Sequence, residues 1–382
     1  MRGHTRKQGN AWYVIVDLPR DAVTGKRKQK WHSGFKTKRE AEKAMTDILS
    51  RLDQGTYVEP TKVTLASFLD EWLAATRSTI RPSTYSTYKS LVEKTIKPKI
   101  GSLPLQSVTA GRLNAFYADL LKSGRRDGRG GLSPATVRYV HAVIRKAFSD
   151  AVRWNQLTRN VADAADPPRP SSPPIRTWSA REVRAFLRHV ENDRLYAAYV
   201  LAATTGMRRG EVLGVRWQDV DLSAGRVSVV RSLTVIDGYA IQFSEPKTAR
   251  GKRSVALDAE TVKVLKEHRE RQMLERALMG DAYEDADLVF ARGDGTPVHP
   301  DGFADAFQRQ AKAAKLPRIR FHDLRHTHAT LALAAGIHPK VVSERLGHAS
   351  VTITLDTYSH AIPAMQETAA SLVASLIFET SP

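Results

Sequence analysis

Residues 321–330, FHDLRHTHAT, place three histidines, an aspartate and an arginine within ten positions. His322 and His326 could share one face of a helix and hold zinc, with Asp323 standing where a metalloprotease has its carboxylate base. A catalytic zinc needs a third protein ligand, however, and Arg325 would set a positive charge beside the cation. The stretch therefore favours a phosphate over a metal, and we expect no metal and no other cofactor.

A second arginine supports the phosphate interpretation. In TGMRRGE, residues 205–211, Arg208 follows a glycine that interrupts a helical pattern. Its side chain and the free backbone N–H groups of a new helix could therefore meet an anion together. Guanidinium groups bind phosphate oxygens in a bidentate manner, which lysine does not. Arg208 and Arg325 would form a phosphate clamp, although two arginines alone establish only binding.

Further along, ERLGHASVTITLDTYSH places His348 ten residues before Tyr358, with Ser350 as a helix cap between them. The four motifs, in this order, resemble those of the tyrosine recombinase (phage integrase) family. TGMRRGE looks like the family's first arginine motif, HDLRHTHAT like its His-x-x-Arg box, LGH like its second histidine and TLDTYSH like its nucleophile segment. The resemblance covers essentially the whole chain.

The resemblance implies a mechanism in which Tyr358 attacks a DNA phosphodiester, leaving a 3′-phosphotyrosine and a free 5′-hydroxyl. Because free tyrosine has a pKa of about 10, a base must assist. His322 is the best candidate, since an ordinary histidine has a pKa of about 6.5. Arg208 and Arg325 would stabilise the charge of the transition state, and His348 would donate a hydrogen bond to the same phosphate.

The family also uses a lysine on a turn between two strands to protonate the leaving 5′-oxygen. In SEPKTARGKRSVAL, residues 244–257, Lys247 stands at the matching position and Lys252 is the runner-up. Glu211 matches the acidic member of the first arginine motif. It would hold Arg208 in position without contacting the substrate itself, or it would only complement the dipole of the helix that begins there.

The other two histidines of the box, His326 and His328, find no clear catalytic role in this scheme. We expect them to pack or to form local hydrogen bonds. At the end of the chain, an amphipathic helix would place four apolar residues on one face: Met365, Ala369, Leu372 and Leu376. In the family such tails often dock on the neighbouring protomer.

Three parts of the chain would position these residues. The surest boundary is DPPRPSSPP, residues 166–174, whose five prolines favour an extended linker. Residues 1–60 are expected to form an arm-type DNA-binding domain, with a three-stranded sheet and one helix. Residues 61–165 would form a helical, SAM-like core-binding domain and residues 175–382 a mixed catalytic domain. The predicted fold is thus multidomain α+β, mainly helical with small sheets.

Local patterns give two sharper expectations. Ser133 as an N-cap and Pro134 at the first helical position predict the start of a helix. Its core stripe would comprise Val137, Val140, Ile144, Phe148 and Ala151. Beyond the linker, strand-like alternation predicts one small antiparallel sheet, with a turn at Asp237 and Gly238.

Charge and composition point to a nucleic acid as the partner. The 382-residue chain has a net charge of +19, with 13 basic against 7 acidic residues before position 61 and 17 against 7 over residues 61–165. With no cysteine, disulfides and thiol nucleophiles are excluded. No apolar run reaches the ~18 residues of a membrane span, and the start is polar and basic, so we expect a cytoplasmic protein.

The function predicted from the resemblance is site-specific DNA recombination by an integrase of a phage or integrative mobile element, through a Holliday junction. The expected partners are double-stranded core and arm attachment sites, further protomers in a homotetramer on DNA, an excisionase and a DNA-bending host protein. A non-catalytic DNA-binding regulator and a type IB-like topoisomerase are the alternatives. The intact set around Tyr358 disfavours the first, and the arm-type domain disfavours the second.

Overall fold

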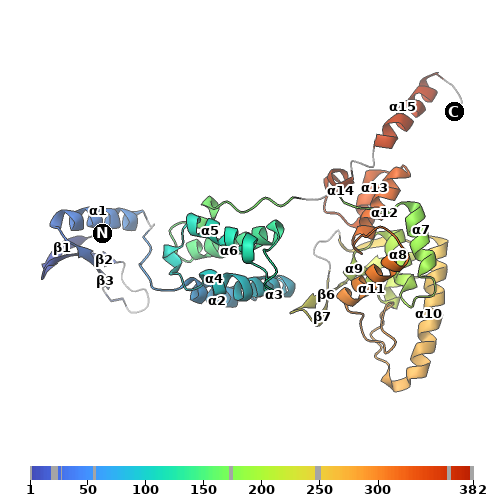
Figure 1. The fold of residues 1–382 in the computed structure, drawn as a ribbon, viewed down its shortest axis with the longest axis horizontal. Helices are drawn as coiled ribbons and strands as arrows, with labels where there is room; N and C mark the ends of the chain where they lie inside the picture. Colours follow the sequence, from blue (N-terminus) through green and yellow to red (C-terminus); the bar gives the residue numbers. More distant parts are fainter. Residues whose placement is uncertain are drawn as a thin grey trace. The chain divides into compact units, whose positions relative to one another are not determined.

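The computed structural model describes residues 2–18, 25–26, 28–54, 57–171, 175–245, 251–358 and 363–378. The chain divides into two compact units, Met1–Ser172 and Pro173–Pro382. Figure 1 shows the elements of each unit. Helices dominate both units and the sheets are small, which confirms the expected mainly helical α+β fold class.

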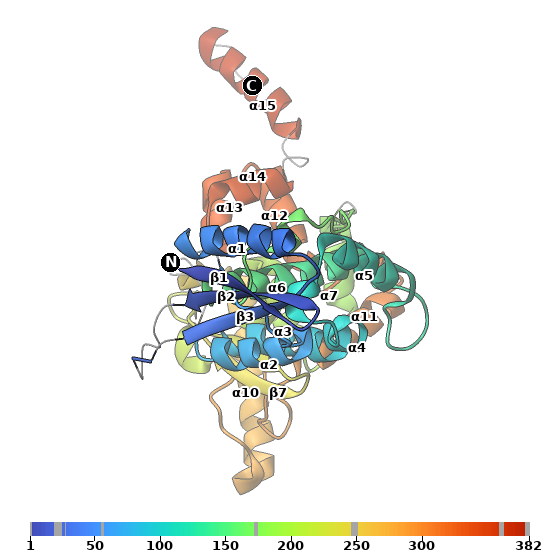
Figure 2. The same ribbon diagram turned by 90° about the vertical axis from the view of Figure 1, so that its left-hand side faces the viewer.

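A three-stranded antiparallel sheet begins the first unit, in the order β1 (Gly3–Gln8), β2 (Ala11–Leu18) and β3 (Lys28–Phe35). Helix α1 (Lys38–Asp53) follows, and a capping box between Thr37 and Glu40 fixes its start. Val14 and Val16 of β2 are fully buried in a cluster with Ala41 of α1. The helix therefore covers one face of the sheet, as Figure 2 shows, and the predicted sheet-plus-helix unit is confirmed.

The rest of the first unit is a helical bundle. Its helices are α2 (Leu65–Thr76), α3 (Pro82–Leu91), α4 (Lys97–Ile100), α5 (Ala110–Ser123) and α6 (Pro134–Arg153). Ser133 caps α6 by accepting a hydrogen bond from the backbone N–H of Thr136, and all five residues of the predicted core stripe are fully buried. Trp72 Nε1 donates to the buried Asp150 Oδ2 at 2.8 Å, which joins α2 to α6.

The second unit is built on nine α-helices among its described residues. They are α7 (Ala180–His189), α8 (Tyr196–Thr205), α9 (Arg209–Gly214), α10 (Ala259–Met279), α11 (Pro300–Ala313), α12 (Asp323–Ala334), α13 (Pro339–Leu346), α14 (Val351–Tyr358) and α15 (Pro363–Phe378). No helix in the described part of the chain is both long and apolar enough to cross a membrane.

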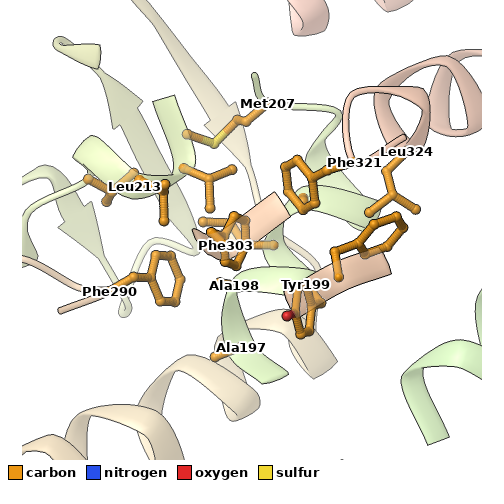
Figure 3. Packing of buried hydrophobic residues seen from close by; sticks show 14 of the residues in the cluster. Ala197, Ala198, Tyr199, Met207, Leu213, Phe290, Phe303, Phe321 and Leu324 are labelled. Carbon is orange, nitrogen blue, oxygen red and sulfur yellow. The ribbon is translucent and has the colours of Figure 1, made fainter. Parts of the chain in front are cut away.

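An aromatic core holds these helices together (Figure 3). Tyr199 of α8 stacks on Phe303 of α11 with ring centroids 5.3 Å apart, and Phe303 meets Phe321 edge-on at 4.7 Å. Met207, Phe321 and Leu324, which are the chain neighbours of Arg208, His322 and Arg325, are all buried in this same cluster. The apolar neighbours therefore fix where the polar residues emerge.

The strands of the second unit differ from the prediction. Instead of one sheet there are two: β4 (Val220–Asp221), β5 (Arg226–Val229) and β8 (Arg253–Ala256) form one, while β6 (Ser232–Ile236) and β7 (Ala240–Ser244) form a separate hairpin. The expected turn at Asp237 and Gly238 is present, and both residues have positive φ.

The single predicted strand over residues 226–236 divides at Arg231. Its Nε donates to the carbonyl of Gly214 at 2.7 Å, and its guanidinium lies 4.3 Å from the ring centroid of Phe243. A Cβ on Gly210 of α9 would lie 2.4 Å from the carbonyl oxygen of Leu233, so α9 approaches β6 closely. Packing against α9 thus directs β6 away from the first sheet, a tertiary contact that alternation in the sequence does not encode.

The C-terminal helix is present as α15. Its described side chains include Leu376, which is 82% exposed, and the apolar Val373, Ile377 and Phe378, which are also exposed. The side chains of Met365, Ala369 and Leu372 lie outside the described part of the chain.

Candidate active site

Arg208 lies at the junction of α8 and α9. Gly206, with φ +66°, ends α8 in the left-handed conformation, and Arg208 is the N-cap of α9. Its backbone N–H donates to Glu211 Oε2 at 2.9 Å and its Nη1 to Glu211 Oε1 at 2.8 Å, while Nη2 reaches the carbonyl of Gly347 at 3.3 Å. The backbone N–H of Arg208 is therefore bound to Glu211 and is not free to meet an anion. The half-exposed guanidinium of Arg208 remains available for that contact.

Arg325 lies in α12 and is only 3% exposed. Its Nη1 donates to the carbonyl of Gly206 at 2.9 Å, but its Nη2 has no hydrogen-bond partner among the described residues. Burial and the nearby charge of Arg208 lower the pKa of Arg325 to about 9. A buried cation with an unused donor is costly unless an anion completes it, so this corner of the molecule is suited to bind one.

Glu211 is buried between two arginines. Besides Arg208, it contacts Arg253, the first residue of β8, whose Nη2 lies 2.8 Å from Oε2 of Glu211. Burial alone would raise the pKa of Glu211, but hydrogen bonding and charge from Arg253, and the charge of Arg208, lower it. The carboxylate is thus ionised at neutral pH and bridges the two cations.

Arg253 was missed in the sequence. Its Nε also donates to the carbonyl of Arg345 at 2.7 Å, near the end of α13. It therefore connects β8, α9 and α13, three elements around the site. The available signal was an arginine one residue after Lys252, beside a strand whose turn was already assigned a catalytic lysine.

His348 follows Gly347, which ends α13 in the left-handed conformation. Its Nδ1 lies 2.8 Å from Oγ1 of the fully buried Thr354 in α14. Burial, followed by the charges of Arg325 and Arg208, lowers the pKa of His348 to about 4, so the ring is neutral at pH 7. When the hydroxyl donates to Nδ1, the proton resides on Nε2, where it can be donated to an anion.

Tyr358 is the last residue of α14 and is only 1% exposed. Burial raises its pKa, and the charges of Arg325 and Arg208 oppose that rise, which places the phenol within electrostatic reach of both. Its ring stacks near the ring of His348, with centroids 6.5 Å apart and planes 10° apart. One chain therefore brings the tyrosine, both arginines and His348 together.

The histidine that contacts the tyrosine is not the predicted one. His326 Nδ1 lies 2.8 Å from the phenol oxygen of Tyr358. The ring of His322, which precedes α12, lies 5.3 Å from the ring of His326 and forms no hydrogen bond to the phenol among the described residues. We expected His326 to pack or to form local hydrogen bonds, whereas its partner is the candidate nucleophile, 32 residues further along the chain.

The remaining members of the box have other partners. His328 Nδ1 donates to the carbonyl of Ala203 in α8 at 3.1 Å, 125 residues earlier in the chain. The carboxylate of Asp323 is held by Arg320, with Nη2 2.8 Å from Oδ1. Among the described residues, no group of three or more histidines and carboxylates is arranged to hold a metal ion.

The candidate general acids lie on the segment between β7 and β8. Lys247, the first choice, lies outside the described residues. Lys252, the runner-up, forms an ion pair with Glu245 at 2.9 Å, and both side chains are largely exposed. An exposed pair of this kind is easily broken.

A second candidate site is the outer face of the N-terminal sheet, opposite α1. Tyr13 of β2 and Trp31 of β3 meet edge-on there with ring centroids 6.1 Å apart, and Trp31 is 45% exposed. Arg6 of β1 pairs with Tyr13 in register. An exposed tryptophan beside a partly exposed tyrosine and a cation on a three-stranded sheet suits a nucleic-acid surface.

Comparison with known proteins agrees with this architecture. Three family models match the chain in order: an arm DNA-binding domain over residues 4–52, a phage integrase N-terminal SAM-like domain over residues 64–121 and the phage integrase family itself over residues 177–365. The chain belongs to the phage integrase family of tyrosine recombinases.

Relatives extend along the full chain. A tyrosine recombinase XerC-like protein of Caldanaerobacter subterraneus subsp. tengcongensis is 29% identical over 377 residues, which is 94% of both chains. The ICEBs1 integrase of Bacillus subtilis is 26% identical over 97% of this chain and 99% of its own. An integrase of Streptomyces ambofaciens is 26% identical over 99% and 96%.

Solved structures share the fold. The integrase of transposon Tn1549, in complex with a circular intermediate DNA, superposes with a TM-score of 0.67 at 21% identity, over 81% of this chain and 99% of its own. A lambda integrase tetramer bound to a Holliday junction gives 0.58 at 20% identity, over 91% and 92%.

Proposed function

We propose that this protein is a site-specific DNA recombinase, the integrase of a phage or other mobile element. Tyr358 attacks a phosphodiester, forming a 3′-phosphotyrosine and freeing a 5′-hydroxyl, so that bond energy is conserved and no cofactor is used. Arg208 and Arg325 hold the non-bridging oxygens, and His348 donates a third hydrogen bond. The phenol's proton goes to the histidines of the box, for which the sequence favours His322, and Lys247 protonates the leaving oxygen.

The single observation that carries this proposal is the buried Arg325. A guanidinium that is 3% exposed, with an unpartnered Nη2 and Arg208 as a charged neighbour, calls for an anion with several oxygens. The candidate nucleophile lies within electrostatic reach of that same guanidinium. A phosphate bound there would lie beside Arg208 and Arg325, which would stabilise its charge, and beside Tyr358, which would attack it.

Glu211 is assigned a positioning role. It bonds both the backbone and the guanidinium of Arg208, which fixes the arginine before DNA arrives. Hydrogen-bond donors that are already held in place cost little free energy of rearrangement when the transition state forms.

The chain outside the catalytic part would bind DNA. Residues 1–60 would bind the arm sites, and residues 61–165 would bind around the core site. Residues 166–174 would link this core-binding domain to the catalytic domain, residues 175–382. The basic excess of the first two parts supplies sequence-independent affinity. We further propose that the protein acts in the bacterial cytoplasm as a homotetramer through a Holliday junction, with an excisionase and a DNA-bending host protein.

A nicked suicide duplex tests the reaction. The duplex spans the junction between the encoding element and its chromosome, and the purified protein is incubated with it in EDTA beside Tyr358→Phe. We expect a covalent protein–DNA band on denaturing electrophoresis for the wild type alone.

The alternatives give different results. Specific binding without any covalent band would identify a DNA-binding regulator. Cleavage and relaxation of supercoiled DNA without exchange between two sites would identify a topoisomerase. Activity that returns only on addition of zinc would restore the metal interpretation of the histidine box.

A further inference from the structure

The phenol of Tyr358 is enclosed, so few groups can take its proton. The residue is 1% exposed and water has little access to it. Its hydrogen-bond partner among the described residues is His326, with Nδ1 2.8 Å from the phenol oxygen and ring centroids 5.6 Å apart. A general base must lie within hydrogen-bond reach of the proton that it removes, and 2.8 Å satisfies that requirement.

We infer that His326, rather than His322, is the catalytic group that accepts the proton of Tyr358 during strand cleavage and returns it during rejoining. This inference rests on the recombinase function proposed above. It identifies which residue of the histidine box touches the nucleophile and gives a chemical role to the residue after Arg325.

The proton and electron balance is complete. In cleavage, the proton moves from the phenol oxygen to Nδ1 of His326 while the oxygen bonds to phosphorus and the bond from phosphorus to the 5′-oxygen breaks. The leaving 5′-oxygen takes a proton from the lysine proposed as general acid. In rejoining, the 5′-hydroxyl gives its proton back to the lysine as its oxygen attacks phosphorus, the bond from phosphorus to Tyr358 breaks, and His326 returns its proton to the phenol oxygen.

The surroundings of His326 leave it able to accept a proton at neutral pH. Burial lowers its pKa, Asp323 opposes that effect, and Arg325 and Arg320 add to it; Tyr358 from α14 and the ring of His322 complete its contacts. His322 forms no hydrogen bond to the phenol among the described residues, and its ring contacts that of His326 instead. The geometry therefore favours His326 over His322 as the base.

Matched variants distinguish the two histidines. His326→Asn keeps a hydrogen-bond acceptor near the phenol but cannot take up its proton, and His322→Asn is its control. The rate of covalent complex formation on the nicked duplex is measured in a single turnover at pH 7.5. We expect a loss of about 100-fold for His326→Asn, which is the ordinary size of general base catalysis, and a smaller loss for His322→Asn.

Two further readouts separate a base from a structural residue. Imidazole added to His326→Ala should restore part of the rate without accelerating the wild type, because the small base can occupy the space left by the side chain. A duplex with a 5′-bridging sulfur at the cleaved bond has a leaving group that needs no proton. That duplex should not rescue His326→Asn, since the defect lies in the attack. Thermal unfolding and DNA binding show that each variant folds.

The inference is overturned if His326→Asn cleaves within about threefold of the wild type, if His322→Asn alone shows the 100-fold loss, or if the sulfur duplex restores His326→Asn to the wild-type rate. It is also overturned if no folded variant at position 326 is rescued by imidazole. Absence of a covalent product from the wild type is a separate result, because it removes the recombinase function itself.

Discussion

Arg253 Nη2 lies 2.8 Å from Oε2 of Glu211, and both side chains are less than 10% exposed. The same carboxylate bonds the backbone N–H and Nη1 of Arg208. A strand residue that touches no substrate in the proposed mechanism thus helps to set the position of the arginine that we propose binds phosphate.

The first prediction concerns this pair. Arg253→Met should lower the free energy of unfolding by up to about 3 kcal/mol, because it leaves the buried Glu211 carboxylate without the more buried of its two cations. It should also slow cleavage, since Arg208 loses a fixed partner. Denaturant unfolding and the suicide-duplex assay measure the two effects. Lys252→Met is the matched control, because its ion pair with Glu245 is exposed and worth under about 1 kcal/mol. Equal destabilisation by both variants would contradict the assignment.

The second prediction concerns Gly206. Its φ is +66°, and an added Cβ would lie 2.5 Å from Cδ2 of Leu346 and 2.9 Å from Cδ2 of His328. Gly206→Ala should therefore cost more than the ~1–2 kcal/mol of a left-handed residue, and it should impair cleavage because the carbonyl of Gly206 holds Arg325.

Gly302 in α11 provides the comparison for thermal unfolding. A Cβ there meets nothing within 4 Å and its φ is not positive, so Gly302→Ala should be neutral or stabilise by about 0.5–1 kcal/mol. If the two glycine variants behave alike, the left-handed turn is not what positions the site.

Replacing either clamp arginine by lysine should separate catalysis from binding. Arg208→Lys and Arg325→Lys are each expected to slow covalent complex formation about 10²–10³-fold, because lysine cannot supply the same paired donors. Affinity for the duplex, measured by gel shift, should change little, since many other basic residues contribute to it. Arg209→Lys is the control: the Arg209 side chain pairs with the exposed Asp301, so the substitution should leave both quantities near wild type.

The general acid can be identified by the leaving group. A 5′-bridging sulfur leaves without a proton, so a variant that lacks only the acid regains its rate on that duplex. We expect Lys247→Ala to cleave the ordinary duplex slowly and to regain its rate on the sulfur duplex. Lys252→Ala should cleave the ordinary duplex at the wild-type rate. The reverse pattern would transfer the role to Lys252 and require its ion pair with Glu245 to break in the complex.

A pH dependence of stability follows from His328. Burial, followed by the charge of Arg345, lowers its pKa to about 4, whereas in the unfolded chain it is about 6.5. Below pH 6.5 the unfolded chain therefore binds more protons than the folded one, and stability falls as the pH decreases toward 4. Calorimetry from pH 7 to pH 4.5 should show a smaller loss of Tm for His328→Phe than for the wild type. Parallel curves would show that other groups cause the acid sensitivity.

The sequence by itself indicated most of the candidate site residues and much of the local structure. Ser133, Ser179 and Asp258 all precede helices whose backbone N–H groups they cap, because capping depends on a few adjacent residues. Arg208, Arg325, His348 and Tyr358 were recognisable because their residue types and order define the motifs, and the structure gathers them in one unit.

Contacts between distant segments were decided by the tertiary structure alone. The division of the strands at Arg231 depends on Gly214 and Phe243, and the link between Arg253 and Glu211 spans 42 residues. His326 and His322 lie one helical turn apart with the same residue type, so spacing cannot tell which one meets a tyrosine 32 residues further on. That choice depends on how α14 packs against α12, and packing is a property of the folded chain rather than of any local pattern.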